Sequence, residues 1–472
     1  MTLPGCSRWR LRQGGSLLCL VYLLALFLLS SILAIWYGVN SDRDYIHPLL
    51  TQLIPAGHCA CESSTTFQCS SCLTCTSSST PQPLLQHHPS STPPPWTFAP
   101  ARDARNEGLT SDQCTTSFPG LFEDIARAST YWATQGRLSS AELDAIPLAH
   151  GMARAFIHHG ELHVVASRAK GEDHRRKILA VLSAMHRALI ADPHRALRPD
   201  LEFVFSVEDK VEDVTGDENP VWVFSRAAAE QAVWLMPDFG FWAWDNPQNS
   251  IGPFDQVVRR IERGDVPWEE KRAQLVWRGK PSFAPKLRRA LMDAARDKPW
   301  GDVKQVDWRD QGNFIPMEEH CRYMFIAHVE GRAYSASLKY RQACNSVIVA
   351  HKLQYIQHHH YLLVADGPNQ NYVEVERDFS DLSEKMEPLL NDPSAAERIA
   401  GNSVRTFRER YLTKAAEACY WRMLFDGYRS VWNSSVPLWS EYYEQERGLR
   451  YESFVLLDSP SMFDFTAILG VY

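Results

Sequence analysis

The segment His328–His351 constrains the fold of this chain more than any other. It predicts a strand ending near His328, a turn of small residues, a helix, and then a continuously apolar strand at 346–350. Gly331, Ser335 and Ser337 lie in the turn, where free N–H groups and hydroxyls at the start of a helix can hold an anion. The alternative is an ordinary connection with small residues for close packing, since no GxGxxG fingerprint is present.

A second segment, Lys271–Arg289, has the same layout. An apolar strand at 274–277 runs into an Arg-Gly-Lys-Pro-Ser turn and then into a basic helix. The two turns lie side by side if their strands are neighbours in one parallel sheet, because ligands bind at the carboxyl edge of such sheets. We therefore predict a diphosphate pocket for a nucleotide-activated sugar, formed by Arg278, Gly279, Ser282, Gly331, Ser335, Ser337, Lys339 and Arg341.

These stretches carry a resemblance to a known family. The Trp-Arg-Gly turn at 277–279, the approach at 320–331, the Ser-Ala-Ser turn and the tail at 371–421 resemble the capsule-associated-protein family, glycosyltransferase family 90. That family includes the Rumi-type protein O-glucosyltransferases and the fungal capsule xylosyltransferases. The resemblance implies a GT-B fold, in which two doubly wound Rossmann-type α/β domains face one another across a cleft.

The resemblance also implies a catalytic base. Asp209 follows a predicted strand at 201–207 and matches the aspartate of the family's N-V-R-D-Y motif. Glu208 replaces the flanking arginine, and its negative charge would raise the pKa of Asp209. The alternative is a solvated loop residue or a helix cap. A second departure is Ser337, which stands where animal members have an arginine, so either Lys339 or Arg341 replaces that charge or the donor is held differently.

Aromatic residues follow at 239–244. Trp242 and Trp244 could stack on the apolar faces of sugar rings and form an acceptor platform, although aromatic residues in a row more often belong to a core. His358–His360 are interpreted as a polar loop, because adjacent residues on a strand point to opposite faces and cannot converge on one ion. No Asp-x-Asp follows a strand end, so we predict that neither a metal nor another cofactor is needed.

The amino-terminal region predicts a membrane protein. Leu17–Tyr37 is apolar and uncharged, long enough for a helix of about 30 Å, and three arginines precede it. This pattern predicts a single-pass type II protein of the Golgi or endoplasmic reticulum membrane with a luminal body; a cleaved signal peptide is the alternative. The net charge of −7 argues against nucleic-acid binding.

The predicted organisation is a cytosolic tail (1–16), a transmembrane anchor (17–39), a Ser/Thr/Pro/Cys-rich stem (40–110), an acceptor-side domain carrying the base (111–268), a nucleotide-sugar domain (269–432) and an extension (433–472). The stem holds five cysteines. In an oxidising compartment they would form disulfides, and the odd one would pair with Cys114 or with a second chain in a dimer. Asn433 begins the chain's one N-x-S/T sequence, a site for a single N-glycan.

Together these features predict an inverting, metal-independent transfer of xylose or glucose from a UDP-sugar to a hydroxyl of a glycan or glycoprotein. Two alternatives stay open. One is a luminal glycan-binding protein without catalytic activity, and the other is a protein O-glucosyltransferase that acts on polypeptide.

Overall fold

The structure is a computed structural model that describes residues 28–30, 96–136, 138–210, 219–244, 251–306, 312–440 and 444–457. The chain divides into two compact units, residues 1–92 and 93–472. Apart from 28–30, the predicted anchor lies outside the described residues, as does the predicted stem up to residue 95. Among the residues that are described, no helix combines the length and the apolar character needed to cross a membrane.

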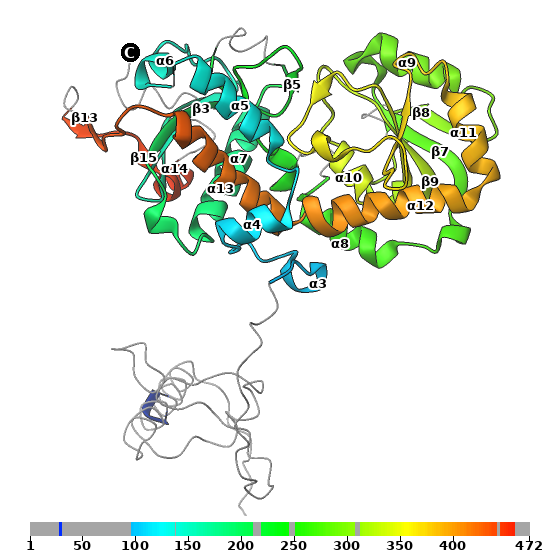
Figure 1. Cartoon of the computed structure of the whole chain (residues 1–472), viewed down its shortest axis with the longest axis horizontal. Coiled ribbons are helices and arrows are strands. Elements are labelled where there is room, and N and C mark those ends of the chain that lie inside the picture. The colour runs from blue at the N-terminus through cyan, green and yellow to red at the C-terminus, as the bar shows by residue number, and fades with distance from the viewer. Residues whose placement is uncertain are drawn as a thin grey trace, which may run out of the picture. The chain divides into compact units, whose positions relative to one another are not determined.

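The second unit contains two lobes, each built on one main β-sheet (Figure 1). The sheet of the first lobe has the order β15-β2-β1-β3-β4-β6. Its strands are β1 (Met152–His158), β2 (Glu161–Arg168), β3 (Leu201–Ser206), β4 (Trp222–Val223), β6 (Trp234–Leu235) and β15 (Leu449–Arg450).

The first sheet is mixed, so the predicted doubly wound topology is wrong for this lobe. β1 pairs antiparallel with both β2 and β3, whereas β3, β4 and β6 run parallel. The cause is the two-residue turn His159-Gly160, in which both residues have positive φ (50° and 75°). Such a turn closes a hairpin and leaves no room for the crossover that parallel strands need.

The helices of the first lobe come from both ends of the folded chain. Cys419, Trp421 and Tyr428 are buried in the same core as the strands, so the last long helix completes this lobe and not the second. The prediction that the chain at 415–431 closes the nucleotide-sugar domain is therefore wrong. The helices are α3 (Pro100–Asp103), α4 (Ser111–Ser117), α5 (Glu123–Thr134), α6 (Ser140–Asp144), α7 (Glu172–Ile190), α13 (Lys414–Val431) and α14 (Tyr451–Leu457).

The edges of the predicted domains also shift. α3 is helical within the stretch predicted as stem, and the backbone N–H of Ala415 donates to the carbonyl of Ala104 at its end. The predicted extension contributes β15, which adds to the first sheet beside β2, and α14, whose Tyr451 hydroxyl lies 2.6 Å from Ser183 of α7. Folded structure of the first lobe thus begins before residue 111 and continues beyond residue 432.

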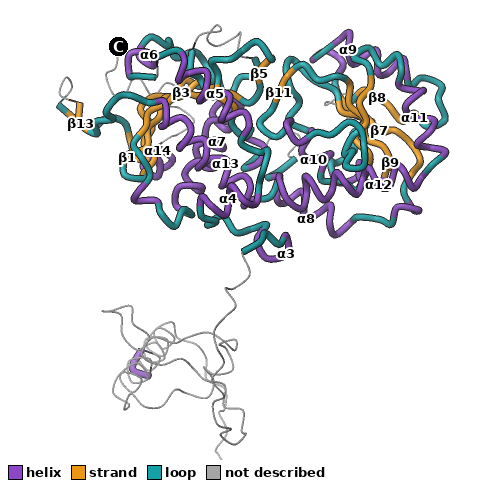
Figure 2. Tube along the Cα trace, in the orientation of Figure 1, coloured by secondary structure: helices purple, strands orange, loops and turns teal. Residues whose placement is uncertain are grey.

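The sheet of the second lobe is entirely parallel, with the order β12-β10-β9-β7-β8, as predicted for this part of the chain. Figure 2 shows its strands β7, β8 and β9 side by side. Side chains alternate between two cores: Trp277 and Val349 face one, and Val276 and Ile348 face the other. Both faces are buried because helices cover each of them. The strands are β7 (Arg272–Gly279), β8 (Gly301–Gln305), β9 (Tyr323–His328), β10 (Val347–His351) and β12 (Val373–Val375).

Different helices cover the two faces of this sheet. One core includes residues of α9 (Pro285–Ala294), α11 (Leu382–Asn391) and α12 (Pro393–Ser403). The other includes residues of α8 (Phe254–Gly264) and α10 (Leu338–Gln342). Because α8 packs on the second sheet, the second lobe spans 251–412 and begins before the boundary predicted at 268/269.

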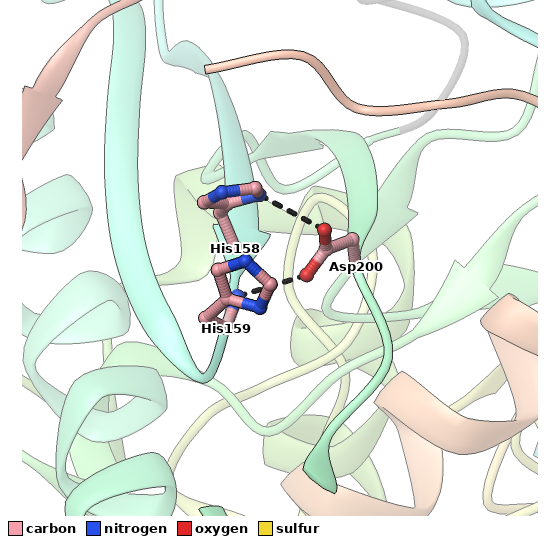
Figure 3. A group of neighbouring side chains, drawn as sticks. All are labelled: His158, His159 and Asp200. Atoms are coloured by element: carbon pink, nitrogen blue, oxygen red, sulfur yellow. Dashed lines mark hydrogen bonds and ion pairs between the residues drawn. The ribbon is translucent and has the colours of Figure 1, made fainter. Parts of the chain in front are cut away.

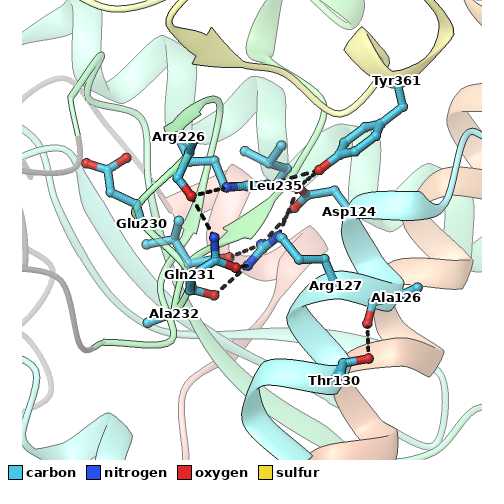
Figure 4. Close-up of polar contacts among 12 residues, drawn as sticks. Asp124, Ala126, Arg127, Thr130, Arg226, Glu230, Gln231, Ala232, Leu235 and Tyr361 are labelled. Carbon is cyan, nitrogen blue, oxygen red and sulfur yellow. Dashed lines mark hydrogen bonds and ion pairs between the residues drawn. The ribbon is translucent and has the colours of Figure 1, made fainter.

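The two lobes are joined by a short sheet and a polar network. β5 (Arg226–Ala227) pairs with β11 (Tyr355–Ile356). Beside it, the fully buried Asp124 accepts hydrogen bonds from Arg226 (2.8 Å), Arg127 (2.8 Å) and Tyr361 (2.7 Å), the last from the second lobe (Figure 4).

The three consecutive histidines lie in the same region. His358 and His359 are 3% and 1% exposed, and their rings pack against Tyr420 and Phe407. Burial lowers the pKa of all three histidines, to about 3 for His358 and His360. The prediction of a polar loop is wrong because these rings are neutral components of the packed interior.

Two disulfides cross-link the described residues. Cys114 of α4 is bonded to Cys419 of α13, and Cys321 is bonded to Cys344. Of the two partners predicted for the odd stem cysteine, Cys114 is therefore excluded, and pairing with a second chain stays a prediction. The five stem cysteines lie outside the described residues.

Candidate active site

Asp209 lies just past the carboxyl end of β3, where it faces both lobes. Burial raises the pKa of its carboxyl group; the charge of Lys177 on α7 lowers it, that of Glu208 raises it, and that of Arg332 lowers it. Arg332 belongs to the turn that follows β9 in the second lobe. The structure thus brings the predicted base next to the turn predicted to hold the donor.

That turn differs from the prediction in one respect. α10 has only five residues, and its N-cap Ser337 forms no side-chain cap hydrogen bond. The hydroxyls of Ser335 and Ser337 lie 2.9 Å apart. So short a helix has a weak dipole, and the expected attraction of a helix terminus for an anion is not the main feature of this turn.

Positive charge at this edge comes instead from two buried arginines, Arg288 of α9 and Arg341 of α10. Arg288 donates to the carbonyls of Glu330 (3.0 Å) and Lys280 (2.7 Å), and Arg341 donates to the carbonyl of Ala327 (2.6 Å). Among the described residues, no carboxylate forms an ion pair with either guanidinium.

The buried surroundings of these two arginines destabilise their charged form. Burial lowers the pKa of Arg288 to about 10; burial and the charge of Arg288 together lower the pKa of Arg341 to about 9. The Nε of Arg341 is buried and has no hydrogen-bond partner. A buried cation without a counter-charge is unfavourable unless an anion joins it, so the pair suits a ligand with negative charge.

Gly331 stands beside this pair. A Cβ at Gly331 would come within 3.4 Å of a terminal nitrogen of Arg288 and 3.2 Å of the carbonyl oxygen of Tyr334. Glycine at this position therefore keeps the backbone close to the arginine, which fits the predicted donor-side role of Gly331.

Two predicted phosphate ligands are engaged elsewhere. Arg278 donates to the carboxylate of Asp302 (2.8 Å) and to its carbonyl (2.6 Å). Although burial opposes it, hydrogen bonds from Arg278, Lys304 and Tyr323 hold the pKa of Asp302 well below its usual range. Lys339 donates to both oxygens of Asp238 and to the carbonyl of Ala336. These contacts use all three protons of its ammonium group, so Lys339 is not placed to bind a phosphate.

The Trp-Arg-Gly turn has a packing explanation. A Cβ at Gly279 would meet the indole of Trp277 at 2.5 Å, so glycine is required for Trp277 to fold back into the core. Ser282 lies in an exposed 3-10 turn, Pro281–Phe283, just before α9. Of the predicted donor residues, Gly331, Ser335, Ser337 and Arg341 lie around the turn after β9.

The predicted aromatic platform lies near Asp209. Trp242 and Trp244 are half-buried and line a cavity of about 300 Å³ together with Asp173 and Lys177. The charges of Lys177 and Asp173 also act on the pKa of Asp209, so two lining residues of the cavity lie within electrostatic range of the predicted base.

Sequence reasoning missed Arg288, Tyr334 and Lys177. Tyr334 is buried near Asp209 and Asp238, both of which add to the effect of burial in raising its pKa. A signal for Arg288 was present: it stands three residues before Leu291, so both side chains lie on the core-facing side of α9. The adjacent Arg289 is exposed.

One group of metal-type ligands occurs among the described residues. Possible ligand atoms of His158, His159 and Asp200 lie within 4.8 Å of one another, and Nδ1 of His158 is 2.9 Å from Oδ2 of Asp200 (Figure 3). This group is at the amino-terminal end of β3, the opposite end from Asp209, so it does not belong to the candidate active site.

Comparison with known proteins agrees with this geometry. Residues 113–444 match the profile of glycosyl transferase family 90, which is more than half of the chain. Protein O-glucosyltransferase 1 of Rattus norvegicus is 23% identical over 265 residues, covering 52% of this chain and 66% of the relative. For the Mus musculus protein of the same name the values are 23% over 297 residues, 59% and 71%.

O-glucosyltransferase rumi of Drosophila melanogaster is 24% identical over 267 residues, covering 50% of this chain and 62% of the relative. The matches thus span about two thirds of the lengths of these relatives. Because the family profile matches more than half of its length, this chain belongs to glycosyl transferase family 90.

Proposed function

We propose that this protein transfers a sugar from a UDP-sugar to an acceptor hydroxyl with inversion at the anomeric carbon, using a GT-B arrangement of its two lobes. The observation that carries the proposal is the position of Asp209 in the first lobe, opposite the turn of the second lobe that lies beside Arg288 and Arg341.

Asp209 accepts the proton of the acceptor hydroxyl as that oxygen attacks the anomeric carbon from the face opposite the nucleotide. The bond between the anomeric carbon and the diphosphate breaks, and its electron pair leaves on UDP. Burial helps the first step, because a carboxylate with a raised pKa is a stronger base.

Arg288 and Arg341 stabilise the charge of the departing diphosphate. Fixed charges in a desolvated site are worth more than the same charges in water. This role replaces the one predicted for Arg278 and Lys339, and it means that the proposed step does not depend on a metal ion.

The donor is UDP-glucose or UDP-xylose. The names of the relatives favour glucose, and the fungal capsule enzymes that the sequence resembles favour xylose. Two disulfides support a body in an oxidising lumen. We place the protein in the Golgi or endoplasmic reticulum membrane, held by the apolar segment at 17–39.

A screen of UDP-sugars with the purified chain tests this function. UDP release should require Asp209 and depend on Arg288: Asp209→Asn should remove transfer and keep UDP binding, whereas Arg288→Met should weaken UDP binding. Arg289→Met is the matched control, since this arginine is exposed on the same helix. Binding of glycans without any UDP release would instead support the non-catalytic alternative, and transfer to folded polypeptides alone would support the protein O-glucosyltransferase.

A further inference from the structure

Three cavities follow helix α7 away from Asp209, and Trp242 lines all of them. The first, of about 300 Å³, contains Lys177. The second, of about 510 Å³, shares Ser183 with the first. The third, of about 440 Å³, shares Arg187 with the second. Because a helix rises 1.5 Å per residue, Lys177 and Arg187 are about 15 Å apart along α7.

The third cavity is lined by residues of α7, α8 and α13. Many of its lining side chains are charged, and they form ion pairs with one another. Arg187 contacts Glu107 at 2.5 Å. Asp255 contacts Arg259 at 2.7 Å and Lys414 at 3.3 Å. Arg288 and Arg341 lack carboxylate partners and suit an anionic ligand, whereas each cation of the third cavity contacts a carboxylate, so this lining offers hydrogen-bond donors and acceptors but no unpaired cation.

The remaining lining fits a neutral ligand with many hydroxyls. Burial and the charge of Glu107 raise the pKa of Glu417 to about 8, against the effect of Lys414, so this carboxyl group is mostly protonated at pH 7 and can both donate and accept. The half-buried Trp242 adds indole surface, whereas Trp421 lies behind the lining and is 1% exposed. The volume lies within the range typical of small-ligand sites.

We propose that these three cavities form one acceptor groove along α7 and that the third holds a distal sugar residue of a neutral oligosaccharide. The inference rests on the proposed function and narrows its acceptor to a glycan longer than one sugar. The sugar that receives the transfer lies at Trp244 and Lys177, and the rest of the glycan runs past Trp242 toward Glu417.

Neutral acceptors of one to five sugars, sharing the same terminal residue, provide the test. In the wild-type protein kcat/KM should rise by about tenfold or more once the acceptor is long enough to reach the third cavity, as one or two added hydrogen bonds would give. Equal kcat/KM values for short and long acceptors would overturn the proposal.

The variant Gln256→Trp tests whether the rise in kcat/KM for long acceptors depends on the third cavity. Gln256 is exposed at the rim of the third cavity, so a bulky side chain there should block the cavity without disturbing the core. The gain for long acceptors should be lost while transfer to the one-sugar acceptor stays within about twofold of wild type. Gln135→Trp, at an exposed position at the end of α5, should leave both unchanged. A gain that survives Gln256→Trp would place the distal sugar elsewhere.

Two outcomes separate this inference from the proposed function. Failure to transfer to any acceptor, with no UDP release, would contradict the function itself. Normal transfer to a short acceptor without any dependence on length, or a preference for polypeptide, would contradict only the groove.

Discussion

The ammonium nitrogen of Lys339 lies 2.6 Å from Oδ1 and 2.9 Å from Oδ2 of Asp238, and each side chain is 1% exposed. Lys339 belongs to α10 in the second lobe, and Asp238 belongs to the loop after β6 in the first. Burial lowers the pKa of Lys339, whereas Asp238 acts in the opposite direction. This buried ion pair therefore connects the two lobes.

Removing one member of this ion pair should destabilise the protein. Lys339→Met leaves Asp238 as a buried, unpaired charge, a change that typically costs about 3–5 kcal/mol. Urea denaturation should show this loss, and the double variant Asp238→Asn/Lys339→Met should recover much of it. The folded fraction should bind UDP as wild type does. A stable Lys339→Met protein with weakened UDP binding would restore the predicted phosphate role of Lys339.

Arg278→Ala should mainly reduce stability, whereas Arg288→Ala should mainly reduce the affinity for UDP. Arg278 holds Asp302, so its loss should reduce stability by about 2 kcal/mol and change UDP affinity little. Arg288 has no carboxylate partner among the described residues, so its loss should weaken UDP binding by about tenfold or more and cost little stability. Calorimetric UDP titration alongside thermal unfolding distinguishes the two, and the reverse pattern would contradict our assignment.

Asp209 should control the acid limb of the pH–rate profile. Transfer requires the ionised carboxylate, so activity should fall as the pH drops through its raised pKa. Lys177→Met removes a charge that lowers this pKa and should move the limb to higher pH, while Glu208→Gln should move it to lower pH. If neither substitution moves the limb of kcat/KM, the titrating base is another group.

The same carboxyl group links activity to stability. Its pKa is higher in the folded than in the unfolded protein, so stability is lost as the pH rises through the folded value. Asp209→Asn should therefore raise the melting temperature slightly at neutral pH while lowering turnover by about 10²–10⁴-fold. Nearly unchanged turnover would instead indicate a structural cap, because Asn caps helices about as well as Asp.

The two disulfides should contribute unequally to the free energy of unfolding. Cys114–Cys419 spans 305 residues and Cys321–Cys344 spans 23. Restricting a longer loop removes more entropy from the unfolded chain, so the double alanine variant of the first should lose about 5–6 kcal/mol and that of the second about 3 kcal/mol. Urea unfolding of each variant checks the order, and equal losses would show that loop entropy does not govern them.

A single N-glycan is expected at Asn433. This residue is exposed just after α13, and its side chain is therefore accessible. Endoglycosidase treatment of the protein should produce one shift in electrophoretic mobility, which Asn433→Gln should abolish. A shift larger than one glycan would contradict the prediction.

Local patterns predicted the second lobe better than the first. The apolar runs at 274–277 and 346–350 could be recognised as buried parallel strands because both faces of a doubly wound sheet are apolar. The hairpin at His159-Gly160 was a readable signal in the sequence that the resemblance to a doubly wound fold obscured.

Other features depend on contacts between distant parts of the chain. Helical spacing indicates that Arg288 is buried, but no local signal shows that it lacks a carboxylate partner while Lys339 is paired with Asp238, about 100 residues away. The burial of His358 by Tyr420 and the pairing of Cys114 with Cys419 are of the same kind. Composition and spacing identified the residue types at the site, whereas tertiary partners decided which of them remained free.

The return of α13 to the first lobe reverses the order in which the parts of this protein can fold during synthesis. Residues 251–412 form one uninterrupted stretch, so the second lobe can fold as soon as it has been made. The strands of the first lobe have to wait for the helix that ends at Val431, 187 residues after Trp244. At about 5–20 residues per second the delay is roughly 10–40 s, during which Cys114 has no native partner. The half that carries the proposed catalytic base is made first and completed last.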